Sequence, residues 1–327
     1  MFVKTLVQAM LALSLIHFVP VNGSTIEFNA SLPTAAARST LNEAFDLAVH
    51  GSPSLPQADS RFPTKIDPNS LGVVTTARSV LVEDRTTGQP LYAKNADAVR
   101  PIGSISKLMA VLVFLESKPN FDAPASIMPV DYRDGGRLYL AMDDPVTVRA
   151  IWQAALVGSD NTALMALVRL SGKTDDDFVA RMNQKAAELG MTSTSFKDPT
   201  GLSPQNVSTA EDLSKLLNAA YQVPEISDTI TLSQVTITQA SGRKVVINST
   251  DELFDTFLTK NPYHLLGGKT GYLPEAGYCM AIGVGHDGSG DVLIILLGSE
   301  TKGTRVQEIK GLADWAYKVF QWPSAQG

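Results

Sequence analysis

Residues 99–116 read VRPIGSISKLMAVLVFLE, and this stretch decides the fold. The run at 108–115 is apolar on every side, so the helix that it predicts has to be buried inside its domain. Pro101 lies just ahead, where a chain enters a helix. If the helix begins near Ser104, the side chains of Ser104 and Lys107 share one face, about 5–6 Å apart at Cβ. A hydroxyl and an amine held together can form a nucleophile without histidine, provided that the lysine is sometimes neutral.

Strand patterns lie on both sides of this helix. We expect strands at residues 78–83, 91–94, 277–283 and 292–297. Periodic apolar residues predict helices at 146–156, 162–170, 177–189 and 209–220, and a last one at 305–320. From Pro224 onward the pattern becomes β-like, with a hairpin of 234–239 and 244–248. Strands at both ends with helices between them indicate an α+β fold, in which one antiparallel sheet is built from distant segments.

Composition bounds the class of protein. The chain has 327 residues, 44% of them apolar and 18% charged, which is typical of a globular protein. Its 33 acidic and 27 basic residues give a net charge of −6, which argues against nucleic acid as the main partner. Cys279 is the single cysteine of the sequence, so no intramolecular disulfide can form, and its strand-like surroundings predict a core residue.

The N-terminus predicts export. Residues 1–23 have the pattern of a secretory signal peptide: Lys4, an apolar core at 6–19 and a small-residue exit at 21–23. The core has about 14 residues whereas a membrane span needs roughly 20, so we expect cleavage and no integral membrane anchor. Residues 24–74 are rich in Ser, Ala and Pro and predict an extended segment, which leaves a folded domain at 75–322.

Three short motifs follow one another along the chain: SISK at 104–107, SDN at 159–161 and KTG at 269–271. Each is weak alone. The Ser-x-x-Lys pattern recurs at 241–244 and 299–302 without a buried helix, Ser-x-Asn is typical of a helix cap or a turn, and Lys-Thr-Gly can end an exposed strand. In this order, and each in a suitable context, the three motifs predict one site.

The motif order resembles that of the penicillin-recognising serine peptidases, which include β-lactamases. The strings VRPIGSISKLM (99–109), LGMTSTSFKDPTGLSPQNVSTAEDL (189–213) and GGKTGYLPEAGYC (267–279) resemble the low-molecular-mass penicillin-binding proteins, the D-alanyl-D-alanine carboxypeptidase/endopeptidase family, over roughly 75–320. The first two strings are most similar to the short type-7 endopeptidase subgroup, from which Asp160 departs because we expect Glu there. The resemblance implies a β-lactamase/transpeptidase-like fold with a five-stranded antiparallel sheet, flanking helices and an inserted helical subdomain.

The resemblance also implies catalytic roles for three side chains. Ser104 would attack the carbonyl of a D-Ala residue and form an acyl-enzyme, and Lys107 would take its proton. Ser159 would relay a proton to the leaving amine. A lysine with the ordinary pKa of about 10.4 is a poor base at neutral pH, so burial and the nearby cation Lys269 must lower the pKa of Lys107.

The substrate-binding residues that the resemblance implies are Asn161, Lys269, Thr270, Gly271 and Tyr272. Asn161 would hold a substrate amide and help to order Lys107, while Lys269 and Thr270 would bind the carboxylate beside the scissile bond. The backbone N–H groups of Ser104 and Tyr272 would form the oxyanion hole, and Gly271 would let the strand approach a ligand closely. We expect no cofactor and no metal, because the sequence has no His-Glu-x-x-His or paired His/Cys spacing. His264 has no Gly-x-Ser-x-Gly elbow to accompany it, which argues against a Ser-His-Asp triad.

These expectations favour a monomeric periplasmic D,D-endopeptidase that cuts D-Ala–diaminopimelate cross-links of peptidoglycan and is acylated by β-lactams. One alternative is a D-alanyl-D-alanine carboxypeptidase, a branch that usually adds a β-rich second domain and a membrane helix for which the last few residues leave no room. Another is a β-lactamase, although no Glu-x-x-Leu-Asn pattern lies between residues 161 and 269. The third is a catalytically silent cell-wall binding protein, which the intact motifs disfavour.

Overall fold

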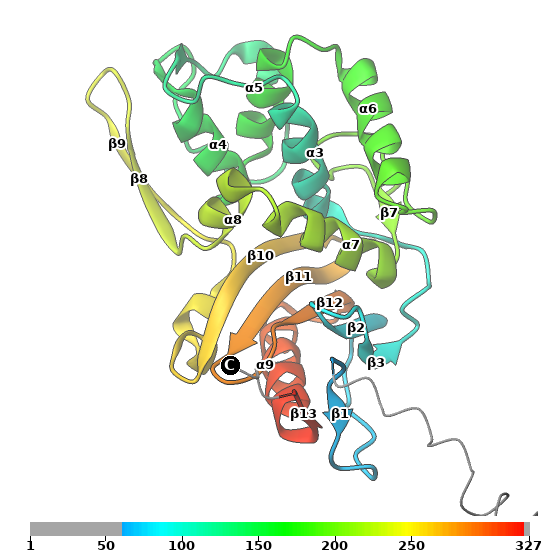
Figure 1. The fold of residues 1–327 in the computed structure, drawn as a ribbon. Helices are drawn as coiled ribbons and strands as arrows, with labels where there is room; N and C mark the ends of the chain where they lie inside the picture. The colour runs from blue at the N-terminus through cyan, green and yellow to red at the C-terminus, as the bar shows by residue number, and fades with distance from the viewer. Residues whose placement is uncertain (1–60, 324–327) are drawn as a thin grey trace, which may run out of the picture. The chain divides into compact units, whose positions relative to one another are not determined.

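A five-stranded antiparallel sheet organises residues 61–323, the part of the chain that the computed structural model describes. The strand order is β10-β11-β12-β2-β3 (Figure 1). The strands span Ser79–Asp84 (β2), Pro90–Lys94 (β3), Tyr263–Leu273 (β10), Gly277–His286 (β11) and Val292–Ser299 (β12). The predicted α+β class, with one antiparallel sheet from distant segments, is confirmed. Strand β10 lies at an edge, so one side of its backbone is free to pair with a ligand.

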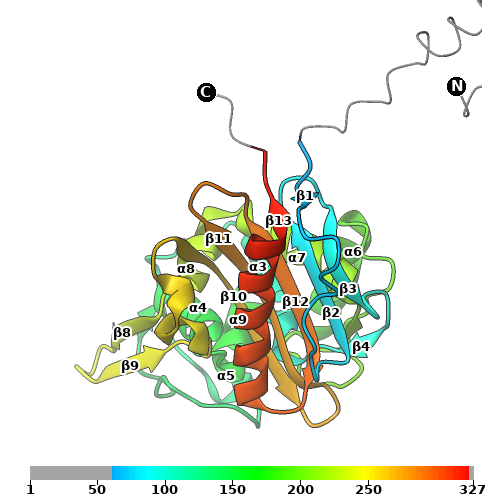
Figure 2. The ribbon, with the colours of Figure 1, turned by 90° about the horizontal axis from the view of Figure 1, so that it is seen from below.

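Side chains of the central strands alternate between two covered faces. Val80 belongs to a buried cluster with residues of α9 (Lys302–Val319), the helix that crosses the sheet in Figure 2. Its neighbour Leu81 belongs to the cluster on the opposite face, which includes residues of α3 (Ser106–Leu115) and α7 (Ala210–Tyr221). Because both faces are buried, these strands read in the sequence as nearly continuous apolar runs.

The inserted helices form a layer of their own beyond the sheet (Figure 1). Around α3 lie α4 (Val148–Leu156), α5 (Asn161–Leu170) and α6 (Asp175–Glu188). Helix α3 is buried along most of its length, as its apolar sequence predicts. The surrounding helices begin where Thr147, Asp160 and Thr174 accept hydrogen bonds from backbone N–H groups of the first turn.

The remaining elements are short. Paired strands are β1 (Thr64–Lys65) with β13 (Phe320–Gln321), β4 (Arg100–Pro101) with β7 (Val207–Ser208), β5 (Pro124–Ala125) with β6 (Val146–Thr147), and the hairpin of β8 (Gln234–Thr238) and β9 (Lys244–Asn248). Single turns of 3₁₀ helix occur at Gly103–Ile105 (η2), Pro129–Asp131 (η3), Glu252–Asp255 (η4) and Phe257–Thr259 (η5), and α8 spans Pro224–Ile230.

One local expectation needs correction, and one is refined. The chain does not become β-like at Pro224, because α8 begins there and proline with its fixed φ suits the first helical position. The central helix α3 begins at Ser106, close to the expected start near Ser104, and Ser104 itself lies in the 3₁₀ turn η2 directly before it. The side chains of Ser104 and Lys107 meet as expected, because the tighter turn keeps residues i and i+3 on one side.

The first part of the chain is described only from residue 61. The predicted signal peptide at 1–23 and residues 24–60 of the predicted N-terminal segment lie outside the described residues. Within that segment, β1 pairs with β13 at the end of the domain. Across residues 61–323, no helix combines the length and apolarity needed to cross a bilayer.

Candidate active site

A cleft of about 610 Å³ lies between edge strand β10 and the helical layer. Its walls include side chains or backbone of Ser104, Ser159 and Asn161 on the helical side and of Thr270, Gly271 and Tyr272 on β10. Lys107 and Lys269 lie directly behind this lining and are hydrogen-bonded to it. The structure therefore brings all three predicted motifs together at one place.

Lys107 is fully buried, and its Nζ lies among three oxygen atoms. It is 2.8 Å from Ser104 Oγ, 2.6 Å from Asn161 Oδ1 and 2.7 Å from the carbonyl oxygen of Thr200. The last two oxygens can only accept hydrogen bonds, so a neutral amine gives them both of its N–H groups. Its lone pair then faces Ser104 Oγ–H, which is the orientation of a general base.

Burial lowers the pKa of Lys107 to about 7, against an ordinary value of 10.5. The carboxylates of Asp198 and Asp160 oppose this shift because they favour the ammonium form. Burial is the largest cause of the lowering. Burial first, then the charges of Lys107 and Arg305, lower the pKa of Lys269 well below its usual range. The repulsion between the two lysines is mutual, so it disfavours charging both of them at once, as the sequence led us to expect.

Ser159 occupies the turn before α5 and contacts the second lysine. Lys269 Nζ donates to Ser159 Oγ at 2.8 Å and to the carbonyl of Thr270 at 3.2 Å. The cap of α5 is Asp160, whose Oδ1 accepts from the backbone N–H of Ala163 at 3.0 Å, so the Ser159 hydroxyl does not cap the helix. Ser159 has φ 56°, a left-handed conformation that a non-glycine residue adopts at a cost and that is common at functional sites.

Asn161 connects the catalytic lysine to a glycine-rich loop. While Oδ1 accepts from Lys107, Nδ2 donates to the carbonyl of Gly135 at 2.6 Å. An amide nitrogen carries two hydrogens, so one remains for a substrate carbonyl. Gly135, Gly136 and Arg137 line the same cleft, and no sequence motif marked them beforehand.

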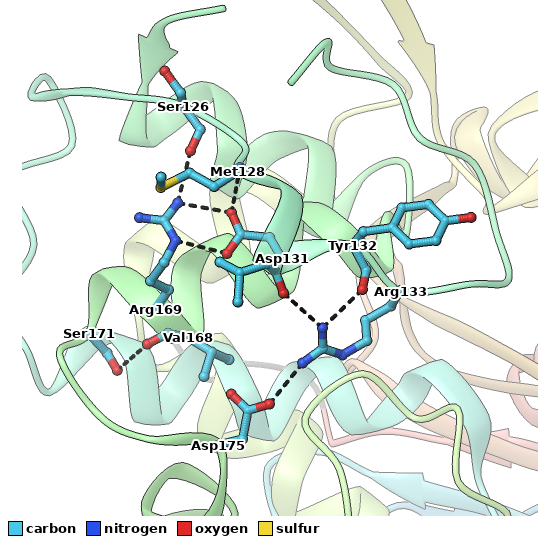
Figure 3. Close-up of polar contacts among 10 residues, drawn as sticks. Ser126, Met128, Asp131, Tyr132, Arg133, Val168, Arg169, Ser171 and Asp175 are labelled. Atoms are coloured by element: carbon cyan, nitrogen blue, oxygen red, sulfur yellow. Dashed lines mark hydrogen bonds and ion pairs between the residues drawn. The ribbon is translucent and has the colours of Figure 1, made fainter. Parts of the chain in front are cut away.

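Ion pairs fix the start of this loop to the helical layer (Figure 3). The buried carboxylate of Asp131 receives Arg169 at 2.8 and 2.9 Å, in a two-pronged arrangement that Arg favours. Arg133 donates to Asp175 Oδ2 at 2.8 Å, at the first turn of α6. These contacts hold residues 131–133, so the glycine-rich part of the loop reaches the cleft from a fixed base.

The glycines around the nucleophile serve backbone packing. A Cβ on Gly271 would overlap the carbonyl oxygen of Ile102, so this glycine lets β10 lie against the turn before Ser104. The predicted close approach is therefore to the protein's own backbone. On the other side, Gly103 (φ 54°) lies against the backbone nitrogen of Tyr272, which brings the two segments expected to form the oxyanion hole side by side.

Gly201 packs against the same turn, and its replacement by alanine gives a testable prediction. A Cβ there would overlap the Gly103 carbonyl, and φ is +88°. We expect Gly201→Ala to lower the free energy of unfolding by about 2–4 kcal/mol and to slow acylation of Ser104 about tenfold. Chemical denaturation and labelling with a fluorescent penicillin measure the two effects.

The matched control for this variant is Gly242→Ala at the tip of the β8–β9 hairpin. Gly242 has φ +85° but open space around its Cα. Its replacement costs only the left-handed backbone conformation, about 1 kcal/mol. Equal losses in the two variants would show that the contact of Gly201 with the nucleophile turn is unimportant.

The other candidate groups stand apart from the cleft. His264 Nδ1 lies 3.6 Å from Asp287 Oδ1 at the opposite end of β10. Cys279 is buried, and burial raises its pKa to about 11, which confirms a core residue. Among residues 61–323, no three or more His, Cys, Asp or Glu side chains cluster as a metal site would require.

Comparison with known proteins gives consistent matches. A family model described as D-alanyl-D-alanine carboxypeptidase matches residues 67–301. The chain is 36% identical to a D-alanyl-D-alanine endopeptidase of Haemophilus influenzae, over 62% of this chain and 68% of that one. It is 33% identical to one of Pseudomonas aeruginosa, over 72% and 76%. Penicillin-binding protein D2 of Listeria monocytogenes, solved in a cefotaxime-bound form, superposes with a TM-score of 0.65 at 30% identity, over 76% of this chain and 100% of that one.

Proposed function

This chain belongs to the family of D-alanyl-D-alanine carboxypeptidases, and on that premise we propose that it is a serine D,D-endopeptidase that cuts peptide cross-links of peptidoglycan. The observation that carries the proposal is the buried Lys107, whose Nζ is 2.8 Å from Ser104 Oγ and whose other two partners accept its N–H groups. The endopeptidase names of the two relatives support cross-links as the substrate.

In the proposed reaction Lys107 takes the proton of Ser104 while Ser104 Oγ attacks the D-Ala carbonyl. The oxyanion is held by the backbone N–H groups of Ser104 and Tyr272. As the C–N bond breaks, the Ser159 hydroxyl gives its proton to the leaving amine and recovers one from Lys269, which donates to it at 2.8 Å. Water then attacks the acyl carbon and gives up a proton, which returns through Ser159 to Lys269. The bond to Ser104 Oγ breaks as that oxygen takes back its proton from Lys107, so both lysines regain their starting forms.

The positive charge of Lys269 matches the carboxylate that lies beside the scissile bond of a cross-link. Lys269 lies behind Thr270, whose hydroxyl is 2.7 Å from that of Thr250 in the cleft wall. An incoming carboxylate favours the ammonium form of Lys269 and so offsets the lowering of its pKa by burial and by the neighbouring cations. Arg305 lines the same cleft and is paired with Glu252 at 2.7 Å.

The same proposal includes the cellular setting. The signal peptide at 1–23 would direct the protein to the periplasm, where its substrate lies, and residues 24–74 would precede a peptidase domain at 75–322. We also propose that the enzyme acts as a monomer and that β-lactams acylate Ser104. The sequence pattern of the first residues supports export, and the cefotaxime-bound structural relative supports the reaction with β-lactams.

Digestion of purified muropeptides tests the proposal. The wild type should convert cross-linked dimers into monomers and leave the terminal D-Ala of pentapeptides in place. Ser104→Ala should leave both the dimers and the pentapeptides uncut. Release of terminal D-Ala with intact dimers would identify a carboxypeptidase instead. Rapid turnover of penicillin would identify a β-lactamase, and loss of cross-links in cells that carry Ser104→Ala would point to a binding role.

A further inference from the structure

A single carboxylate organises the loop behind Lys107. Asp198 Oδ1 accepts from the backbone N–H of Thr200 at 2.7 Å, from its hydroxyl at 2.5 Å and from the N–H of Gly201 at 2.9 Å. It also lies 3.3 Å from the N–H of Leu202, and Oδ2 accepts from Ser203 N–H at 2.7 Å. Five donors on one side chain fix the path of residues 200–203, including the direction of the Thr200 carbonyl.

The loop is also joined to the start of the central helix. Asn206 Oδ1 accepts from the backbone N–H groups of Lys197 and Asp198 at 2.7 and 3.1 Å. Its Nδ2 donates to Ser106 Oγ at 3.0 Å, and that hydroxyl donates to the carbonyl of Gly103. The loop and the nucleophile turn are therefore parts of one hydrogen-bonded unit.

The Thr200 carbonyl has a definite task in this unit. A neutral lysine has two N–H groups and one lone pair, and without two fixed acceptors the lone pair would be free to turn away from Ser104. Asn161 Oδ1 supplies one acceptor, and the Thr200 carbonyl, 2.7 Å from Lys107 Nζ, supplies the other. The oxygen atom that completes the orientation thus belongs to the loop that Asp198 holds.

We propose that Asp198 is a positioning residue for the proton transfer, because it fixes the Thr200 carbonyl that directs the Lys107 lone pair at Ser104. The proposal deepens the proposed function and rests on it. Asp198 acts on Lys107 by charge as well, since its carboxylate favours the ammonium form. The other charged groups that face Lys107 are Asp160 from the start of α5 and Lys269 from β10.

Asp198→Asn is the direct test, with Asp212→Asn as the matched control. Asp212 is another buried carboxylate that orders a loop, with Ser193 N–H at 2.8 Å and Thr194 Oγ1 at 2.9 Å, but it has no contact with Thr200. Two quantities are measured in the full-length protein: the rate of Ser104 acylation by a fluorescent penicillin, and the pKa of Lys107 from ¹³C-labelled lysine NMR. Lys107→Met assigns the Lys107 signal.

Asp198→Asn should slow acylation about tenfold above pH 8 and move the titration of Lys107 about one pH unit lower. Asp212→Asn should leave both unchanged. Asp198→Glu keeps the charge but displaces the loop, so acylation should fall while the Lys107 titration stays near that of the wild type.

A wild-type acylation rate in Asp198→Asn above pH 8 would overturn the proposal, and so would equal slowing of acylation in the Asp198→Asn and Asp212→Asn variants. If Asp198→Asn does not fold, a wild-type acylation rate in Asp198→Glu overturns it. A wild type that penicillin does not acylate would refute the proposed function, whereas normal acylation of both the wild type and Asp198→Asn would refute the positioning role alone.

Discussion

Lys107→Met is expected to slow acylation of Ser104 by about 10³–10⁴-fold, the upper part of the range for loss of a general base. The reason is geometric. Nζ is the one nitrogen within 2.8 Å of Ser104 Oγ among the hydrogen bonds of residues 61–323, and methionine cannot accept a proton. Stopped-flow labelling with a fluorescent penicillin, followed by mass spectrometry of the Ser104 peptide, measures the loss.

The fold should survive this replacement, so the lost rate can be read as lost chemistry. Methionine has a similar length and flexibility, and it removes the cost of burying an amine that is 0% exposed. Against this gain, Asn161 Oδ1 and the Thr200 carbonyl lose their donor, which costs about 1–3 kcal/mol for each. We therefore expect a change in unfolding free energy within a few kcal/mol and a native circular dichroism spectrum.

The Lys107→Arg variant tests whether acylation needs a base at this position or only a positive charge. Arginine keeps positive charge and N–H donors but stays protonated in proteins, so it cannot act as the base. It should lose as much activity as Lys107→Met. If either variant keeps more than about a tenth of the wild-type rate, another group takes the proton of Ser104 and the mechanism is wrong.

The parts of the site that side chains form could be predicted from the sequence. An apolar run with Ser104 and Lys107 at its start predicted a buried helix with both groups on one side, and the structure has both. The order of the motifs predicted that distant segments meet at β10. The buried helix is predictable because apolar periodicity and residue spacing determine it directly, whereas the meeting of the motifs is what the family resemblance implied.

Parts of the site defined by backbone atoms were not predictable in this way. A carbonyl such as that of Thr200 occurs in every residue, so nothing in the sequence marks it as a partner of Lys107. Gly271 was correctly marked for close approach, but its neighbour turned out to be the Ile102 carbonyl. The start of α8 at Pro224 was missed because proline there is compatible with both a turn and a first helical position.

The pH dependence of acylation should follow the proton on Lys107. Because burial sets the pKa of this lysine at about 7 in the free enzyme, the fraction of neutral base falls about tenfold for each pH unit below 7. The second-order rate of acylation at pH 5 should then be about 100-fold below its plateau above pH 8. An acylation rate that still rises with pH up to about pH 10 would mean that Lys107 keeps an ordinary pKa and that burial does not activate it.

The same shift predicts how stability depends on pH. The pKa of Lys107 is 10.5 in its ordinary environment and about 7 when folded, so between these values the unfolded chain binds more protons. The contribution of Lys107 to the free energy of unfolding therefore rises with pH across that window. Below about pH 7 the full cost of burying this lysine is present. Lys269, whose pKa is also lowered, changes the pH dependence of stability in the same direction. Burial raises the pKa of Asp251 to about 6, so Asp251 affects stability only at pH values below this window. Relative to wild type, Lys107→Met should thus gain more in melting temperature at pH 6.5 than at pH 10, and a gain independent of pH would refute a buried lysine with a lowered pKa.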